Sequence, residues 1–374
     1  MKISVERAAL LKATSRAQGV VERRTTIPIL SNVMIEAEGG GASLRATDLD
    51  IEITETVPAM VERAGAATAP AHTLHEIARK LPDGATVTLT HDQAAGRLEV
   101  SAGRSRFTLP TLPREDFPVM ASNEYAATYS AKAGQLRRLF DKTSFAISTE
   151  ETRYYLNGVY LHAPAAAPGA APKLRAVATD GHRLACVDAD APEGSVGAPD
   201  VIVPRKTVGE LRKILEGDDA DVTVSVSPTK IRFACGDLVL VSKVIDGAFP
   251  DYSRVIPVGN DRRMEVDAAD FKRTVDRGAT VSAERSRAVK LSLDQDRLVL
   301  TVTSPDSGSA TDELAVAYDA EPMEIGFNAK YLLEIADQID RENAVFLFAD
   351  SGAPTLVREG DDESAVYVVM PMRV

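Results

Sequence analysis

The chain contains one pattern three times, as APAHTLHEIARKLPDGATVTLT at 69–90, VPRKTVGELRKILEGDDADVTVSV at 203–226 and FNAKYLLEIADQIDRENAVFLFA at 327–349. Each copy runs from a strand end into a short amphipathic helix, through a turn and into another strand. The copies lie much farther apart than the roughly 20–50 residues that separate the units of solenoids and propellers. Each copy therefore indicates a separate domain, and the chain is expected to be a tandem of three.

Two further elements recur in the same order around each copy. A helical pattern stands before each one and reads VERAALLKATSRAQGVV at 5–21, KAGQLRRLFDKTSFAIS at 132–148 and DAADFKRTVDRGATVSA at 267–283. A strand-like segment stands after each one and reads FTLPTLPREDFP at 107–118, LVSKVIDGAFPDY at 240–252 and YVVMPMRV at 367–374. Elsewhere, alternating apolar residues bounded by Gly, Pro, Asn or Asp predict half-buried antiparallel strands. The prediction is an α+β fold of three similar domains, each with two helices packed on antiparallel sheets, at residues 1–124, 125–251 and 252–374.

The repeat alone leaves open how these domains are joined. Domains with open sheet edges can pair edge to edge, which makes continuous sheets and places all the helices on one face. Curved into an arc, such a chain forms part of a ring with the helices inside. A plain string of three domains is the alternative.

The composition is that of an ordinary globular protein and argues against several classes. Of 374 residues, 44% are hydrophobic and 26% are charged, and no apolar run approaches the roughly 20 residues that span a bilayer. The early glutamate in MKISVERAALL argues against a signal peptide. The two cysteines, Cys186 and Cys235, form no CxxC motif. We therefore expect a reduced, cytoplasmic protein with no zinc site and no membrane partner.

The helical segments are more basic than the chain as a whole, whose net charge is −12. Their basic residues are Arg23, Arg24, Arg79, Lys80, Arg137, Arg138, Lys142, Arg205, Lys206, Arg212, Lys213, Lys272, Arg273 and Arg277. A locally basic surface on an acidic protein suits loose, sequence-independent contact with DNA phosphates, and the acidic remainder discourages binding elsewhere. The alternative is that these side chains lie on ordinary solvated helix faces. The last helical segment, at 331–343, is acidic and weakens the pattern.

The stretch ATDGHRLA at 178–185 raises a catalytic alternative. A hydrolase could use an acid–base pair and a nucleophile drawn from Asp180, His182 and either Thr179 or Ser148. If Asp and His lie two apart on one strand, they point to the same face without necessarily touching. The chain contains no GxSxG elbow and no HExxH motif. The counterpart ATDLDIEI at 46–53 keeps Ala-Thr-Asp but has no histidine, which favours turn architecture that one domain has adapted for recognition.

A set of motifs in chain order carries a family resemblance. They are RRTTIPILSN (23–32), ATDLDIEI (46–53), GRSRFTLPTLPREDFP (103–118), RYYLNGVYL (153–161), ATDGHRLA (178–185), VIVPRKTV (201–208), GAFPDYSRVIP (247–257), MEIGFNAKYLLE (323–334) and YVVMPMRV (367–374). The set resembles the bacterial sliding clamps, the beta subunits of the replicative DNA polymerase III, from end to end. The resemblance implies a head-to-tail homodimeric ring of six domains, of which this chain is half. Such a ring encircles duplex DNA, slides along it and holds the polymerase on the template, with no catalysis and no cofactor.

The resemblance also implies which residues face the DNA. By position they are Arg24, Tyr154, Tyr155 and Lys206, and the charge of the helices adds Arg137 and Arg138. His72, Thr73 and Glu150 differ from the side chains that other clamps often place there, so the DNA path is left open. A slider needs many weak phosphate contacts and no base readout.

A second implied site is a groove that binds short linear peptides of partner proteins. The matching residues are Arg153, Leu156, Thr179, Gly181, His182, Arg183, Leu184, Pro250, Arg254, Val255, Asn328, Tyr331, Val368, Met370, Pro371, Met372 and Arg373. Apolar side chains supply sub-pockets, and methionine adapts to different partner side chains. Arg183, Arg254 and Arg373 are expected to hold polar atoms of the peptide. The implied partners are the polymerase III alpha subunit, the clamp loader delta subunit and other proteins with a clamp-binding motif.

The third implied site is the dimer seam. The strand RSRFTL (104–109) would pair with an edge of the third domain in the next subunit. Its expected contributors are Arg104, Arg106, Phe107 and Leu109 on one side and Thr280 and Val281 on the other, with acids Asp306, Asp312 and Glu313 nearby. A repeat-built adaptor that binds only proteins shares the groove without the ring. A stable monomer that cannot stay on circular DNA would favour that alternative.

Overall fold

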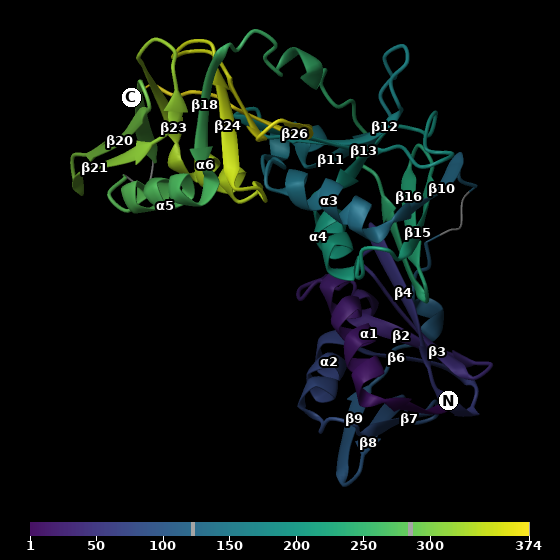
Figure 1. Ribbon diagram of the computed structural model, residues 1–374. Helices are drawn as coiled ribbons and strands as arrows, with labels where there is room; N and C mark the ends of the chain where they lie inside the picture. The colour runs from purple at the N-terminus through teal and green to yellow at the C-terminus, as the bar shows by residue number, and fades with distance from the viewer. Residues whose placement is uncertain (121–123, 283–286, 374) are drawn as a thin grey trace. The chain divides into compact units, whose positions relative to one another are not determined.

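The computed structural model describes residues 1–120, 124–282 and 287–373. The chain separates into two compact units, Met1–Arg137 with Pro192–Val244 and Arg138–Ala191 with Ile245–Val374. The division falls inside the middle repeat, so each unit combines one outer repeat with part of the middle one (Figure 1). No helix in the described part of the chain is both long and apolar enough to cross a bilayer.

The first unit contains two antiparallel sheets. One has the order β5 (Met60–Arg63), β1 (Lys2–Glu6), β7 (Thr86–Asp92), β8 (Arg97–Ala102) and β9 (Ser105–Pro110). The other has the order β10 (Ala127–Lys132), β15 (Asp221–Val226), β16 (Lys230–Cys235), β17 (Leu238–Lys243), β4 (Ile51–Pro58), β3 (Gly41–Thr47), β2 (Asn32–Glu38) and β6 (Gly65–Pro70). The helices of this unit are α1 (Arg7–Val20), α2 (Ala71–Lys80) and α4 (Arg205–Ile214), which follows the strand β14 (Val201–Pro204).

The second unit also contains two sheets. One includes the order β11 (Gly158–His162), β12 (Lys173–Thr179), β13 (Arg183–Asp190), β26 (Asp362–Val369), β25 (Thr355–Glu359), β24 (Asn343–Phe348), β18 (Arg262–Asp267) and β22 (Ala317–Tyr318). The other is β21 (Gly308–Ala315), β20 (Arg297–Ser304), β19 (Ala288–Asp294) and β23 (Met323–Asn328). The helices α5 (Ala268–Ala279) and α6 (Ala329–Ala336) belong to this unit, and α3 (Ala133–Ser144) spans the division. Short 3-10 turns occupy Pro28–Ser31, Arg114–Asp116, Glu151–Leu156 and Tyr252–Arg254.

The sheets run across the expected domain boundaries. In the first unit β17 of the middle repeat pairs with β4 of the first, from Leu238 opposite Glu55 to Ser242 opposite Ile51. In the second unit β13 of the middle repeat pairs with β26 of the third. Backbone N–H and C=O groups of both edges are thereby satisfied. The prediction of an α+β fold is confirmed, and of the two ways of joining the domains that the repeat left open, the structure shows edge-to-edge pairing.

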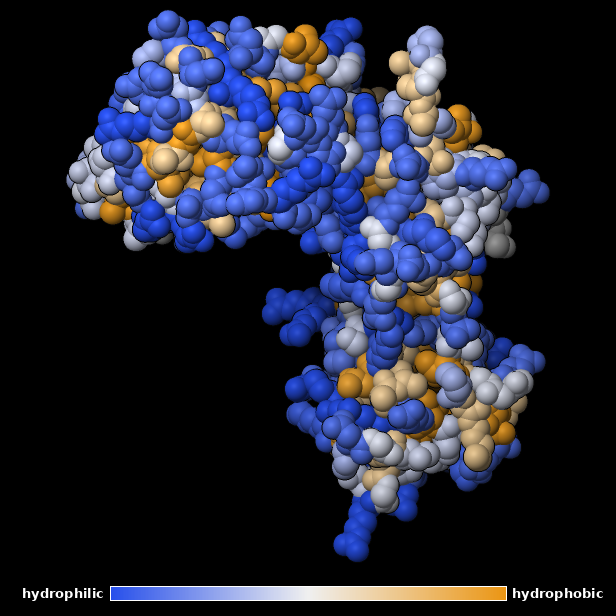
Figure 2. Space-filling model, in the orientation of Figure 1, coloured by the Kyte–Doolittle hydropathy of each residue, from blue (hydrophilic) through white to orange (hydrophobic). Residues whose placement is uncertain are grey.

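The helices bury one apolar face, and α5 and α6 also have side-chain N-caps. In α5 the buried face consists of Phe271, Thr274, Val275 and Gly278, and the Asp267 side chain caps the N-terminus by accepting the Asp270 N–H. Gly278 is required by packing, since a Cβ there would lie 2.5 Å from Leu300 Cδ2. α5 packs beside α6, as α1 packs beside α2. The surface over α5 and α6 is mostly hydrophilic in Figure 2.

The segment HAPAAAPGAAPK at 162–173 connects β11 to β12 and is largely exposed. Its alanines and prolines contribute little to the core. The cysteines Cys186 and Cys235 lie on β13 and β16 as free thiols.

One buried ion pair links the middle and third repeats inside the second unit. Lys142 of α3 contacts Glu359 of β25, and both side chains are less than 10% exposed. Lys142 also contacts Asp340 at 2.8 Å, in the turn after α6. A buried charge without its partner is costly, because neither solvent nor a counter-ion replaces the lost interaction.

We expect Lys142→Ala to destabilise the second unit by about 3–5 kcal/mol, because Glu359 is left buried without its cation. The matched control is Lys12→Ala, which removes an exposed pair with Glu216 and should cost about 0–1 kcal/mol. Urea unfolding of both variants measures the difference. Equal shifts in the two unfolding midpoints would contradict the structural role of the buried pair.

Candidate functional site

The hairpin between β12 and β13 holds the ATDGHRLA motif. Asp180 and His182 lie in its turn, so the expectation that they share one strand is wrong. One Asp180 carboxylate oxygen accepts the backbone N–H groups of His182 at 2.9 Å and of Arg183 at 3.1 Å. The ring of His182 instead stacks with that of Tyr331, with centroids 6.2 Å apart. Asp180 therefore shapes the turn, and the two side chains do not form an acid–base pair.

Gly181 occupies a position that only glycine fits. Its φ of +89° lies in the left-handed region, and a Cβ there would meet Arg153 Nη1 at 2.7 Å. Arg153 is held there by Glu150, 2.7 Å away. Gly181 thus allows the guanidinium of Arg153 to approach the backbone of the turn.

Arg183 is buried and fully engaged within its own unit. Its guanidinium donates to Asp180, to Glu334 of α6 and to the Phe145 carbonyl. It also lies 4.5 Å from the centroid of the Tyr331 ring. This geometry favours a positioning role for Arg183, in place of the expected contact with polar atoms of a peptide. Arg183 fixes the hairpin turn against α6.

The C-terminal segment is tied between two sheets. The Met370 N–H donates to the His182 carbonyl at 2.9 Å, and the Met372 N–H donates to the Gly326 carbonyl on β23 at 2.9 Å. Pro371 stands between them and has no N–H to satisfy. These bonds order a segment that would otherwise fray. The side chain of Met370 remains 37% exposed and faces solvent at the end of β26.

An apolar cluster lies beside this segment. Leu184 and Val368, which face each other in the β13–β26 ladder, pack with Val177, Cys186 and Tyr252. The predicted groove residues Pro250, Arg254 and Val255 are neighbours of Tyr252 in the chain and are all exposed. The cluster is therefore buried, and the exposed turn that carries these three predicted residues follows Phe249 in the chain.

That turn is anchored by aromatic and polar contacts that sequence reasoning missed. The Tyr252 hydroxyl lies 2.9 Å from His162 Nε2 and accepts from Arg175 Nη1 at 3.2 Å. Tyr160 stacks between His162 and Phe249, at centroid distances of 4.4 and 4.9 Å. Alternate aromatic residues on β11 were the available signal, since period-two positions share a face.

Three other predicted groove residues lie on the 3-10 turn Glu151–Leu156 and at α6. Leu156 is buried, Asn328 caps α6 by accepting the Lys330 N–H, and Tyr331 is half-buried over Arg183. Burial raises the pKa of the Tyr331 hydroxyl, so it stays a neutral hydrogen-bonding group at neutral pH. A cleft of about 900 Å³ adjoins the tail and is lined by Pro371, Met372, Arg373, Lys290 and Glu324 among others.

The predicted DNA-facing residues divide into two groups. Arg24 is exposed, Tyr154 is 54% exposed, and Tyr155 packs against it edge to face. Lys206 donates to Asp48 at 2.5 Å and to the Val20 carbonyl at 2.8 Å. In the second group, Arg137 donates to the Leu215 carbonyl and Asp218, and Arg138 donates to the Asp188 carbonyl and Ser364. Those two arginines have structural partners that their charge did not reveal.

The predicted seam residues lie where a seam requires an open edge. β9 is the edge of its sheet, as β21 is of the four-stranded sheet, and the tip of the β8–β9 hairpin is hydrophilic in Figure 2. Phe107 is 37% exposed, whereas Leu109 is only 6% exposed and already packs inside its own unit. Arg106 pairs with Glu99 at 2.8 Å, and Arg104 and Thr280 are exposed while Val281 is half-buried.

The same region contains the three acids expected near the seam. Asp312 pairs with Arg277 and Glu313 pairs with Arg297, so both have partners in their own unit, and Asp306 lies in the turn between β20 and β21. Within the described ranges, no cluster of three or more His, Cys, Asp or Glu side chains is placed to hold a metal ion.

Three family models match successive parts of the chain. They describe the N-terminal, central and C-terminal domains of the DNA polymerase III beta subunit, and they match residues 1–121, 131–251 and 253–373. Curated relatives agree over their full length. The Beta sliding clamp of Caulobacter vibrioides is 54% identical over 374 residues, and that of Escherichia coli K12 is 37% identical over 377, with 100% of both chains covered in each case.

Solved structures give the same result. A sliding clamp from Bartonella birtlesii bound to griselimycin has a TM-score of 0.96 at 50% identity, with both chains covered completely. A sliding clamp from Caulobacter crescentus has a TM-score of 0.92 at 53% identity, again with complete coverage. On this evidence the chain belongs to the DNA polymerase III beta subunit family and is a non-catalytic DNA sliding clamp with three α+β domains.

Proposed function

We propose that this clamp works as a head-to-tail homodimeric ring that encircles duplex DNA without reading its sequence. Its domains comprise residues 1–124, 125–251 and 252–374, and each subunit supplies half of the ring. The observation that carries the proposal is the pair of open sheet edges, β9 in the first domain and β21 in the third. Unpaired edges attract other strands, and head-to-tail pairing closes both edges at once. The ring works in the cytoplasm, at the nucleoid during replication.

The DNA contacts of the ring are weak by construction. Arg24 and Tyr154 are exposed, and Lys206 is 38% exposed while it holds Asp48. A lysine that already has a carboxylate partner adds little net affinity for a phosphate, because that partner must be given up. Few strong phosphate contacts allow sliding, and topology supplies the retention. Arg137 and Arg138 act mainly in the protein's own packing.

The groove of the second unit recruits the partners. Its occupants are short peptides of the polymerase alpha subunit, the clamp loader delta subunit and other proteins with a clamp-binding motif. The ordered tail from Val368 to Met372, which is hydrogen-bonded to His182 and Gly326, supports this assignment. Exposed Met370 beside a buried apolar floor offers a peptide side chain an adaptable pocket.

The ring predicts topological retention. Once loaded, the clamp should stay on closed circular DNA and run off the same DNA after linearisation, since no tight contact holds it. Gel filtration of loaded complexes before and after a single restriction cut measures this. Equal loss from circular and linear DNA would exclude encirclement and would leave the adaptor alternative.

The groove predicts that the tail is needed for peptides and not for assembly. A chain truncated at Val369 loses the segment that bridges His182 and Gly326, so a clamp-binding peptide should no longer be pulled down. The truncated protein should still be a dimer, because the removed segment bonds to β23, at the opposite edge of its sheet from β21. Retained peptide binding would overturn the groove assignment.

The anchored turn predicts a graded effect. Tyr252→Phe keeps the packing but removes the hydroxyl that contacts His162 and Arg175, so peptide affinity should fall by roughly fivefold, as expected for one hydrogen bond. Tyr154→Phe, outside this cluster, is the matched control and should leave peptide affinity unchanged. Calorimetric titration with one peptide compares them, and an unchanged affinity for the Tyr252 variant would contradict the anchoring role.

A further inference from the structure

The two internal domain boundaries are built in the same way. At the first boundary Ile51, at the start of β4, faces Ser242 on β17. At the second, Arg183, at the start of β13, faces Val369 on β26. β4 and β13 are equivalent strands in their domains, each following a turn that opens with Ala-Thr-Asp, and β17 and β26 are each the last strand of theirs. The boundary is therefore a repeated structure with a repeated register.

Each boundary also has an equivalent ion pair. The tenth residue of the first helix of one domain reaches the acid that follows the second helix of the next domain. At the first boundary Arg16 of α1 reaches Glu216, with a distance of 3.2 Å. At the second boundary Lys142 of α3 reaches Asp340, with a distance of 2.8 Å. Glu216 and Asp340 occupy the same place in the repeated pattern of their domains.

The third domain contains the basic residue of this ion pair, at the same position of its first helix. The tenth residue of α5 is Arg277, which contacts Asp312 on β21 at 2.6 Å. Arg16 contacts Glu55 on β4 in the equivalent way, and the two acids face equivalent leucines, Leu300 and Leu44, in their ladders. Within the described ranges, Asp312 is the carboxylate that pairs with Arg277, and no acid that corresponds to Glu216 lies beside Arg277.

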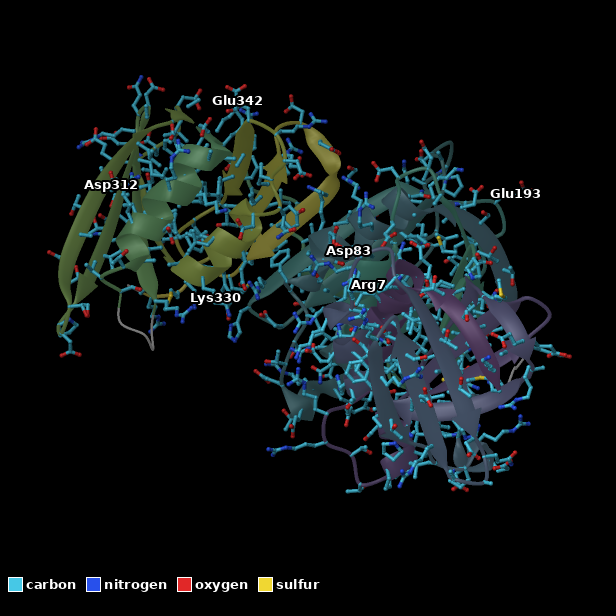
Figure 3. All side chains as sticks on the ribbon, turned by 90° about the horizontal axis from the view of Figure 1, so that it is seen from below. Arg7, Asp83, Glu193, Asp312, Lys330 and Glu342 are labelled. Carbon is cyan, nitrogen blue, oxygen red and sulfur yellow. The ribbon has the colours of Figure 1, made fainter. Side chains whose placement is uncertain are left out.

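An acid that corresponds to Glu216 occurs in the first domain. Asp83 follows α2 directly after Pro82, which aligns with Glu216 in the repeated pattern. Its side chain is 96% exposed and contacts Arg7 at 2.5 Å, as Figure 3 shows for these two labelled residues. An exposed carboxylate on the domain that ends in the open edge β9 is available to a cation from another chain.

We propose that, at the intermolecular seam, Arg277 of one subunit binds Asp83 of the partner subunit, as Arg16 binds Glu216 inside the chain. This inference rests on the homodimer proposed above and adds its register. In this comparison β9 corresponds to β17 and β21 corresponds to β4. If the seam has the same residue pairing as β17 with β4, Ser105 lies opposite Asp312, Arg106 opposite Thr311 and Phe107 opposite Ala310. Arg277 then bridges Asp312 and Asp83, as Arg16 bridges Glu55 and Glu216.

A charge exchange tests the bridge. Arg277→Glu should weaken the dimer at least about fivefold at each seam, because a repulsive pair replaces an exposed attractive one. Adding Asp83→Lys to the same chain recreates an opposite pair at both seams and should restore most of the lost affinity. The control is Arg277→Glu combined with Glu76→Lys, which restores the same net charge through an exposed residue of α2 that is outside the proposed contact. This control should not restore the dimer affinity.

Analytical ultracentrifugation at low and high salt measures the dimer dissociation constant, and urea unfolding checks that each variant is folded. Rescue by Asp83→Lys but not by Glu76→Lys supports the bridge. Equal rescue by both, or a dimer indifferent to Arg277→Glu, overturns it. A wild-type chain that stays monomeric at micromolar concentration refutes the homodimer itself, so the two failures are distinguishable.

Cysteine pairs test the register. In a Cys235→Ser background, Arg106→Cys with Thr311→Cys should give a disulfide-linked dimer under mild oxidation, because facing residues in an antiparallel ladder lie about 4.5–5.5 Å apart. Arg106→Cys with Ala310→Cys puts the thiols on opposite faces and should not cross-link. If the dimer forms and only the second pair cross-links, the register is wrong, and if neither does, the boundary is not repeated at the seam.

Discussion

Backbone pairing between sheet edges is the constraint on which this clamp depends. Each domain ends in strands whose N–H and C=O groups need partners, and the chain satisfies them by letting β17 continue into β4 and β26 continue into β13. The same rule leaves β9 and β21 open. Domain joining, ring closure and the placement of the groove all follow from where these edges lie.

The proposed groove depends on the second of these boundaries. Joining β13 to β26 brings Leu184 opposite Val368 and carries the tail to the hairpin turn, where Met370 bonds to His182. Arg183 holds that turn through contacts with Asp180 and α6. A stretch that looks catalytic in sequence is thus a structural turn, in which Asp180 accepts the backbone N–H groups of His182 and Arg183.

Charge has a different role from the one that composition suggests. Most basic side chains on the helices have partners inside the protein, and Arg16 and Lys142, at equivalent helix positions, each pair with an acid of the next domain. What remains for DNA is sparse, which suits a ring that must slide. The acids that neutralise these cations are local to each boundary, so the net charge of the chain does not describe them.

The sequence by itself determined the three-domain α+β architecture and the family, because period, turns and repeated motifs are local and ordered properties. Only the tertiary structure decided which ends meet. It showed that Arg183 and Arg138 are engaged internally, that Leu109 is buried, and that His162 anchors Tyr252. These facts depend on contacts between residues distant in sequence, whose partners are set by strand pairing and packing and not by neighbouring residues.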